Sequence, residues 1–105
     1  MENEDIAGKL GALGNPTRLS VYRLLVRAGE AGVPVGSVQK SLGIPGSTLT
    51  HHIRILVTAG LAGQEREGTT LICRARYETM HEIIDYLKDE CCADSSDRSS
   101  SESAA

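Results

Sequence analysis

Apolar residues recur at helical spacing in five stretches of the chain, each bounded by turn-forming residues. The clearest stretch covers residues 47–59, between Pro45-Gly46 and Gly60, and Ser47 is its expected N-cap. One side of this helix is apolar, which predicts a buried stripe of Leu49, Ile53, Leu56 and Val57. The other side lacks acids and carries Ser47, His51, Arg54 and Thr58, with Thr48 and Thr50 at its edges. These groups suit the major groove of DNA, although an ordinary solvated face would also be polar.

Four further helices are predicted, over residues 5–13, 16–28, 35–42 and 77–92. Asn15 is the expected cap of the second helix, with Pro16 at its first position. In that helix Leu19, Tyr22, Leu25 and Val26 point inward, and Arg18, Arg23 and Arg27 point largely outward. The first helix places Ile6, Leu10 and Leu13 on one side, and the last helix places Met80, Ile83, Ile84 and Leu87 on one stripe.

Two β-leaning segments follow the polar helix, at residues 61–65 and 69–76, and Glu67-Gly68 is a hairpin-type turn between them. Residues 30–34 are expected to be a loop. Two short helices joined by a tight turn, followed by a β-ribbon, predict a winged helix-turn-helix. Arg66 at the tip of the ribbon, and Arg74 and Arg76 on its second strand, are candidates for phosphate contacts. Solvated hairpin charges are the alternative interpretation.

The 105 residues suit one small domain, over residues 1–92, with an aliphatic core because the chain has no Trp or Phe. Residues 93–105 are a polar, serine-rich, acidic tail that is expected to be disordered. The acidic N-terminus is not that of a signal peptide, and no apolar run matches a bilayer span, so a cytoplasmic location without membrane contact is expected. Net charge is −3 overall, but residues 14–76 carry eight Arg or Lys against three Glu, or +5. A basic middle fits a nucleic-acid ligand.

A known family shares these features in the same order. The segments beginning at Leu13 (LGNPTRL), Val35 (VGSVQKSLGI), Ser47 (STLTHHIRILVTAGL) and Arg66 (REG) resemble arsenic- and metal-responsive repressors of the ArsR/SmtB type. The resemblance covers about residues 6–92. It implies an α+β fold of about five helices and a two-stranded wing, paired into a homodimer through the first and last helices. It also implies a repressor that leaves its operator when it binds an inducer.

The resemblance places Ser47, Thr48, Thr50 and His51 at the family's DNA-reading positions, and His52 at a recurrent histidine. Helical periodicity places His52 at the edge of the core, which predicts a structural role for it. Arg54 and Arg66 complete the predicted DNA-contacting set. The arsenic site that some members have in the helix before the recognition helix is absent, because residues 35–42 contain no cysteine. The family's zinc site is incomplete, since the last helix offers His81 and Asp85 without a second histidine.

The adjacent pair Cys91-Cys92 resembles the arsenic site that other members carry at the end of the last helix. Soft thiolates suit As(III) or methylated trivalent arsenic, and two sulfurs would suit the methylated form well. The helix C-terminus and nearby acids raise the thiol pKa, which favours arsenic capture over oxidation. Cys73, on the second wing strand, is interpreted as a core residue, with a third arsenic ligand as the alternative.

The expected function is therefore an arsenic-responsive repressor that binds double-stranded operator DNA as a homodimer and has no catalytic cofactor. A thiol-redox sensor or a zinc/cadmium sensor of the same fold is the alternative. An enzyme is not expected, because no cysteine is paired with a recognisable base and no phosphate-binding loop is present.

Overall fold

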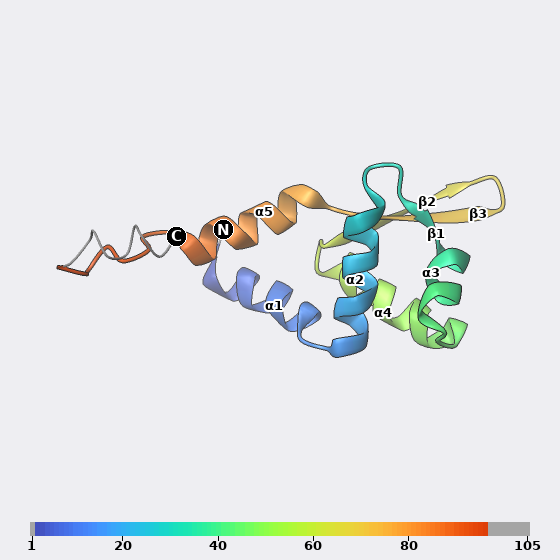
Figure 1. The fold of residues 1–105 in the computed structure, drawn as a ribbon, viewed down its shortest axis with the longest axis horizontal. Helices are drawn as coiled ribbons and strands as arrows, with labels where there is room; N and C mark the ends of the chain where they lie inside the picture. The colour runs from blue at the N-terminus through green and yellow to red at the C-terminus, as the bar shows by residue number, and fades with distance from the viewer. Residues whose placement is uncertain (1, 97–105) are drawn as a thin grey trace.

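The computed structural model describes residues 2–96 (Figure 1). Within them lie five helices and three strands in the order α1 (Asn3–Leu13), α2 (Pro16–Ala28), β1 (Val33–Pro34), α3 (Val35–Leu42), α4 (Gly46–Thr58), β2 (Ala62–Glu67), β3 (Thr70–Ala75) and α5 (Tyr77–Lys88). The expected winged helix-turn-helix is confirmed: α3 and α4 form the helical pair, and β2 and β3 form the wing.

The sheet is antiparallel with strand order β1-β3-β2. Cys73 in β3 lies opposite Gln64 of β2 on one side and Val33 of β1 on the other. Helix α2 packs against both β3 and α4. The aliphatic core lies between these elements and is made of residues such as Val21, Leu25, Val38, Leu49, Ile53, Leu56 and Leu61. Its burial holds α4 in place, so the polar side of that helix faces outward.

Local sequence signals explain most helix ends. The Asn15 side chain accepts a hydrogen bond from the Arg18 backbone N–H at 2.9 Å, and Pro16 occupies the first turn of α2. Gly43 ends α3 with a positive φ of 64°, a conformation that glycine adopts without strain. The prediction for α4 is wrong at its start: Pro45 is the N-cap, and Ser47 lies inside the helix without a capping bond.

Other boundaries also differ from the predictions. Strand β2 runs to Glu67, which pairs with Thr70, so the hairpin turn is Gly68-Thr69 and not Glu67-Gly68. Residues 33–34, expected to be a loop, form β1 and give the sheet a third strand. Helix α5 ends at Lys88 rather than at residue 92, and residues 89–94 form turns in which Glu90 and Cys92 have φ of 58° and 61°. Cys91 and Cys92 therefore lie in these turns, after the end of the last helix.

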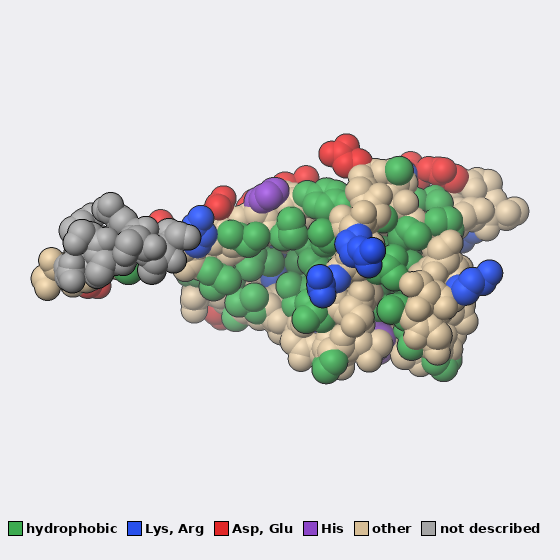
Figure 2. All heavy atoms as spheres, in the orientation of Figure 1, with side chains coloured by type: hydrophobic (Ala, Val, Ile, Leu, Met, Phe, Trp, Pro, Cys, Tyr) green, Lys and Arg blue, Asp and Glu red, His purple; other side chains and the backbone are tan. Residues whose placement is uncertain are grey.

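Helices α1 and α5 lie side by side at the end of the molecule away from the wing (Figure 1), and the Tyr86 hydroxyl donates to Asn3 Oδ1 at 3.1 Å. Leu10 on α1 and Ile84 and Leu87 on α5 remain exposed, and apolar side chains gather over this part of the visible face (Figure 2). Leu19 and Val57, both expected inside, are also exposed. No helix among residues 2–96 has the length and apolar character needed to cross a membrane.

Candidate DNA-binding face and thiol pair

Helix α4 presents the polar side that the sequence predicts. Ser47, Thr50, His51 and Arg54 are exposed, and Thr48 is half-buried at the edge. The Thr50 hydroxyl donates to the Gly46 carbonyl at 2.9 Å, so its oxygen can still accept a hydrogen bond from a ligand. Arg54 has no acidic partner among the described residues. These residues share one outward face, and their contact with DNA remains a prediction.

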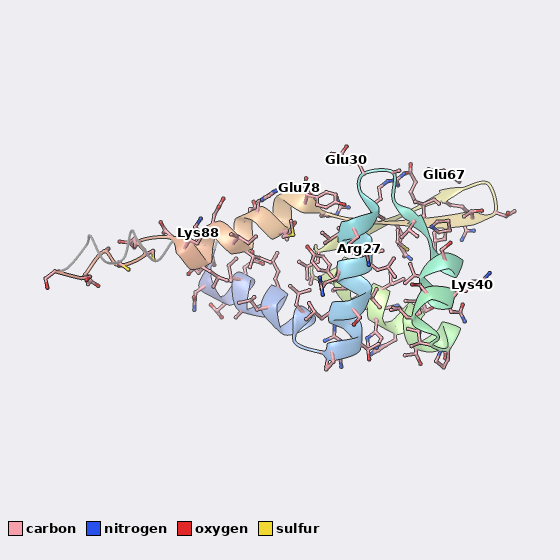
Figure 3. The ribbon with its side chains drawn as sticks, in the orientation of Figure 1. Arg27, Glu30, Lys40, Glu67, Glu78 and Lys88 are labelled. Carbon is pink, nitrogen blue, oxygen red and sulfur yellow. The ribbon has the colours of Figure 1, made fainter. Side chains whose placement is uncertain are left out.

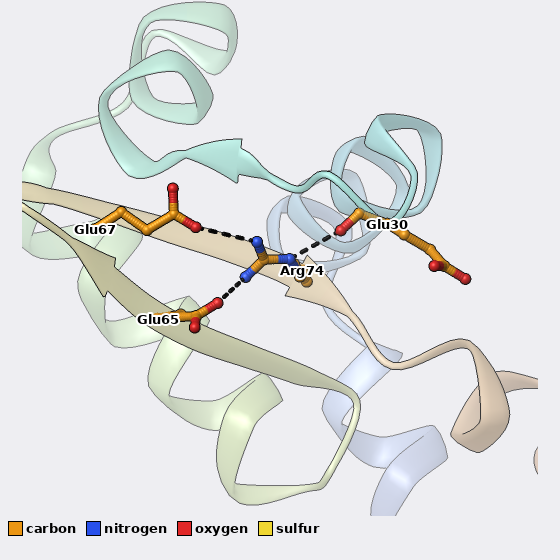
Figure 4. Close-up of polar contacts among 4 residues, drawn as sticks. All are labelled: Glu30, Glu65, Glu67 and Arg74. Carbon is orange, nitrogen blue, oxygen red and sulfur yellow. Dashed lines mark hydrogen bonds and ion pairs between the residues drawn. The ribbon is translucent and has the colours of Figure 1, made fainter.

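The arginines of the wing differ in whether they form ion pairs within the protein. Arg66 near the tip is exposed and has no ion pair within the described part of the chain. Arg74 is half-buried and paired within the protein (Figure 4): its guanidinium contacts Glu65 at 2.7 Å and Glu67 at 3.4 Å, and its Nε donates to the Glu30 carbonyl at 2.9 Å. These contacts occupy the Arg74 guanidinium within the protein, and its contact with phosphate stays an untested prediction.

Arg76 is exposed at the N-cap of α5, and its guanidinium lies over Gly63, where an added Cβ would come within 3.1 Å of Nη2. Acidic residues lie along the same edge of the molecule: Figure 3 places Glu30, Glu67 and Glu78 there, and Figure 2 shows acidic side chains at separate points along it. Acidic side chains next to Arg76 make the approach of a phosphate there less favourable. Of the three candidate arginines of the wing, Arg66 is therefore the one best placed to contact DNA.

Arg18 and His52 form an arrangement that the sequence analysis missed. Arg18 was assigned to an outward face, but its Nε donates to the Ala12 carbonyl and its Nη1 lies 3.4 Å from His52 Nδ1. His52 is 8% exposed, in line with the expected structural role, and the pKa of its imidazole is lowered by burial and then by Arg18 and His51. No local pattern signals this contact, because the two residues are 34 positions apart.

The two thiols of Cys91 and Cys92 are exposed and lie together, with 3.7 Å between their sulfur atoms. The pKa of Cys91 is raised, mainly because its thiol shares a hydrogen bond with Cys92. The direction agrees with the sequence argument, but the main cause is the neighbouring thiol rather than the helix terminus. For scale, two sulfurs bound to one tetrahedral metal at about 2.3 Å lie about 3.8 Å apart.

The other candidate ligands lie elsewhere. Cys73 is 0% exposed in the sheet core, where the Gln64 amide donates to its sulfur at 3.7 Å, and burial raises its pKa. His81 and Asp85 are exposed on α5. Across residues 2–96, no three His, Cys, Asp or Glu side chains converge as a metal site. Residues 93–94 are in a turn and residue 96 is in a bend, and the rest of the predicted tail, 97–105, lies outside the described residues.

Sequence comparison identifies relatives over the same part of the chain. Residues 13–62 match a helix-turn-helix domain family. An uncharacterized HTH-type transcriptional regulator of Methanocaldococcus jannaschii is 38% identical over 58 residues, which are 55% of this chain. That match spans only 63% of the archaeal protein, less than two thirds of its length. The HTH-type transcriptional regulator YgaV of Escherichia coli K12 is 26% identical over 89 residues, covering 85% of this chain and 88% of YgaV.

Solved structures share the fold. An ArsR-like transcriptional regulator from Rhodococcus sp. RHA1 superimposes with a TM-score of 0.71 at 21% identity, over 81% of this chain and 77% of that one. The homodimeric winged helix-turn-helix DNA-binding domain Mb0332 from Mycobacterium bovis, a possible ArsR-family regulator, gives 0.67 at 24% identity, over 83% and 81%. The match to a helix-turn-helix domain thus covers residues 13–62, and both the archaeal relative and YgaV are HTH-type transcriptional regulators. The winged helix-turn-helix fold of this chain is shared with both of these solved structures.

Proposed function

We propose that the protein is an arsenic-responsive repressor of the ArsR family that binds operator DNA as a homodimer in the cytoplasm. Trivalent arsenic, inorganic or methylated, binds Cys91 and Cys92 and lowers the affinity for the operator. One observation carries the choice of inducer: two exposed thiols lie 3.7 Å apart just after the last helix. Two neighbouring exposed thiols can turn toward one thiophilic atom and bind it with both sulfurs.

The DNA side of the proposal rests on the outward face of α4. Ser47, Thr48, Thr50 and His51 lie along the first half of that helix, where recognition helices contact base edges. Arg54 and Arg66 supply unpaired positive charge from α4 and the wing. A dimer would place two such faces on the two half-sites of a palindromic operator, one helical turn or a multiple of it apart.

The dimer is proposed to form through α1 and α5, because both carry exposed apolar side chains at the same end of the molecule. Leu10, Ile84 and Leu87 are 38%, 42% and 60% exposed, and burying them against a second copy would remove apolar surface from water. Cys91 follows Leu87 by four residues. Arsenic bound there would therefore act next to the dimer contact, where a small shift changes the distance between recognition helices.

Two cysteines supply two As–S bonds. A methylated trivalent arsenical has two open valences, so this site would complete its coordination, whereas inorganic As(III) would need a third ligand such as hydroxide. Cys73 is buried in the wing sheet and is not grouped with the thiol pair, which supports a two-sulfur site. The raised pKa of Cys91 disfavours the thiolate that oxidation needs, so a redox sensor is the less supported alternative.

The test is fluorescence anisotropy of a labelled DNA fragment from the protein's own promoter. The wild type should bind in a salt-dependent manner and be released by methylarsenite or arsenite. The Cys91→Ser, Cys92→Ser protein should bind with similar affinity and ignore both arsenicals. Cys73→Ala should keep the response if the site has two sulfurs. If zinc or peroxide releases the DNA and the arsenicals do not, the proposed inducer is wrong. If binding does not depend on salt, the DNA-binding proposal is wrong.

A further inference from the structure

The side chain of Arg18 joins three helices. It belongs to the first turn of α2, yet its Nε donates to the Ala12 carbonyl and its Nη2 to the Gly11 carbonyl at 3.4 Å, both in the last turn of α1. Carbonyls in the last turn of a helix lack intrahelical donors, and they favour a nearby cation. Helix α1 has no basic residue of its own there. Arg18, which belongs to the neighbouring helix α2, thus caps the C-terminal end of α1.

The third contact of Arg18 is with α4. Its Nη1 lies 3.4 Å from His52 Nδ1, and a guanidinium has only donors, so Nδ1 must act as the acceptor. A neutral ring that accepts at Nδ1 carries its proton on Nε2. Burial of His52 favours this neutral form, because a charged ring would lose its hydration. The neighbouring charge of Arg18 and the ring of His51, whose centroid lies 5.8 Å away, also disfavour a charged imidazole.

Direct packing between α1 and α4 is incomplete. A groove of about 670 Å³ lies between them, with Gly8 and Gly11 of α1 on one side and His51 and Arg54 of α4 on the other. Arg18 also lines this groove and bridges the two helices. The orientation of α4 relative to α1 therefore depends on a few polar contacts as well as on the shared core.

We propose that Arg18 is a positioning residue for operator binding: through His52 and the end of α1, it fixes the angle at which α4 is presented. The inference rests on the proposed DNA-binding function. Helix α1 carries part of the proposed dimer surface. The contacts of Arg18 with α1 and α4 therefore fix the orientation of the recognition helix α4 relative to the two-fold axis of the dimer. His51, on the predicted DNA-reading face, is the residue immediately before His52 and moves with it.

A double-mutant cycle on operator affinity tests the link. Arg18→Met keeps most of the side-chain length and removes the donors, and His52→Leu removes the acceptor while keeping an apolar core residue. We expect each change to weaken binding about tenfold and the double variant to be weakened by about the same factor, because both remove one interaction. Purely additive losses would overturn the proposal. Thermal unfolding is measured for all variants, and binding is compared below the lowest transition.

Two readouts separate positioning from other roles. If Arg18 contacted phosphate itself, Arg18→Met would reduce the slope of log affinity against log salt by about one, which would also overturn the proposal. In NMR titrations, the pKa of His52 should rise in Arg18→Met, because a neighbouring positive charge is lost. It should not change in Arg23→Met, which removes an arginine from the same helix. An unchanged His52 pKa in Arg18→Met would contradict the contact.

The same experiments distinguish failure of this inference from failure of the proposed function. If the wild-type protein shows no salt-dependent operator binding, the DNA-binding proposal itself is wrong. If the wild type binds and Arg18→Met binds with the same affinity and salt slope, the proposed function stands and the positioning role of Arg18 is excluded.

Discussion

Arg74 and Glu65 face each other across the wing, with 2.7 Å between the guanidinium Nη1 and the carboxylate Oε1. Glu67 approaches the same guanidinium at 3.4 Å, and the Glu30 carbonyl accepts from its Nε. Arg74 therefore ties both wing strands to the loop before β1. Arg66, on the same hairpin, has no such partner in the described part of the chain. Two arginines that look equivalent in the sequence thus have different roles.

This difference predicts separate effects of removing each charge. Arg66→Gln should weaken operator binding severalfold and lower the salt slope by about one, since one phosphate contact is lost. Arg74→Gln should leave the salt slope unchanged and reduce the free energy of unfolding by less than about 1 kcal/mol, because its partners are mostly exposed. Anisotropy at several salt concentrations and thermal unfolding measure the two effects. A reduced slope for Arg74→Gln would contradict its assignment.

The sequence predicts those parts of the fold that local chemistry controls. Asn15 and Pro16 at the start of α2, and Gly43 at the end of α3, act through their own backbone neighbours, and the structure confirms the boundaries they indicate. The outward polar face of α4 follows from helical periodicity alone. Two apolar residues that were predicted to be buried, Leu19 and Val57, are exposed in the structure. A monomer of this size cannot bury every apolar residue.

Features that depend on distant residues were not predictable. Strand β1 is two residues long and exists only because Val33 and Pro34 pair with Cys73 and Ile72, about 40 positions away. Likewise, α5 ends at Lys88 without a glycine to signal it. The contacts of Arg18 with His52 and of Arg74 with Glu30 join segments that no local pattern connects. These long-range contacts decide which arginines are free to bind a ligand.

Gly32 is required by its surroundings. Its φ is 78°, and an added Cβ would lie 2.7 Å from Ile72 Cγ2 and 2.9 Å from the Cys73 carbonyl oxygen. Gly32→Ala should therefore lower the free energy of unfolding by about 1–3 kcal/mol and the Tm by several degrees or more.

Gly36→Ala is the matched control for this substitution. Gly36 lies within α3, and a Cβ there would meet nothing within 4 Å. That substitution should leave the stability unchanged or raise it by about 0.5–1 kcal/mol. Calorimetry measures the Tm of both variants, and Gly32→Ala should have the lower value. Equal Tm values would show that β3 can move away from the loop without a loss of stability.

The exposed end of α5 predicts how the protein associates. Leu87 is 60% exposed beside Ile84, and a charge there would be buried without a partner if this surface forms the dimer. Leu87→Asp should raise the dimer dissociation constant about a hundredfold or more. His81→Asp adds the same group to an exposed position of the same helix, away from the apolar stripe, and should remain dimeric. Sedimentation equilibrium gives both constants, and a Leu87→Asp protein that dimerises normally would place the interface elsewhere.

The hydrogen bond between Cys91 and Cys92 predicts the pH dependence of the thiol pair. It raises the pKa of Cys91 above its ordinary value of 9.0, so this thiol keeps its proton to a higher pH than a free cysteine. Because the thiolate is the species that reacts with iodoacetamide, alkylation should speed up as pH rises through and beyond 9.0. Cys92→Ala removes the bonding partner and should shift the alkylation profile of Cys91 to lower pH. Cys92→Ser keeps a hydroxyl that can accept the bond and should shift the profile less. Mass spectrometry of the alkylated protein follows Cys91 separately from the buried Cys73, and identical profiles in the wild type and Cys92→Ala would show that the two thiols do not interact.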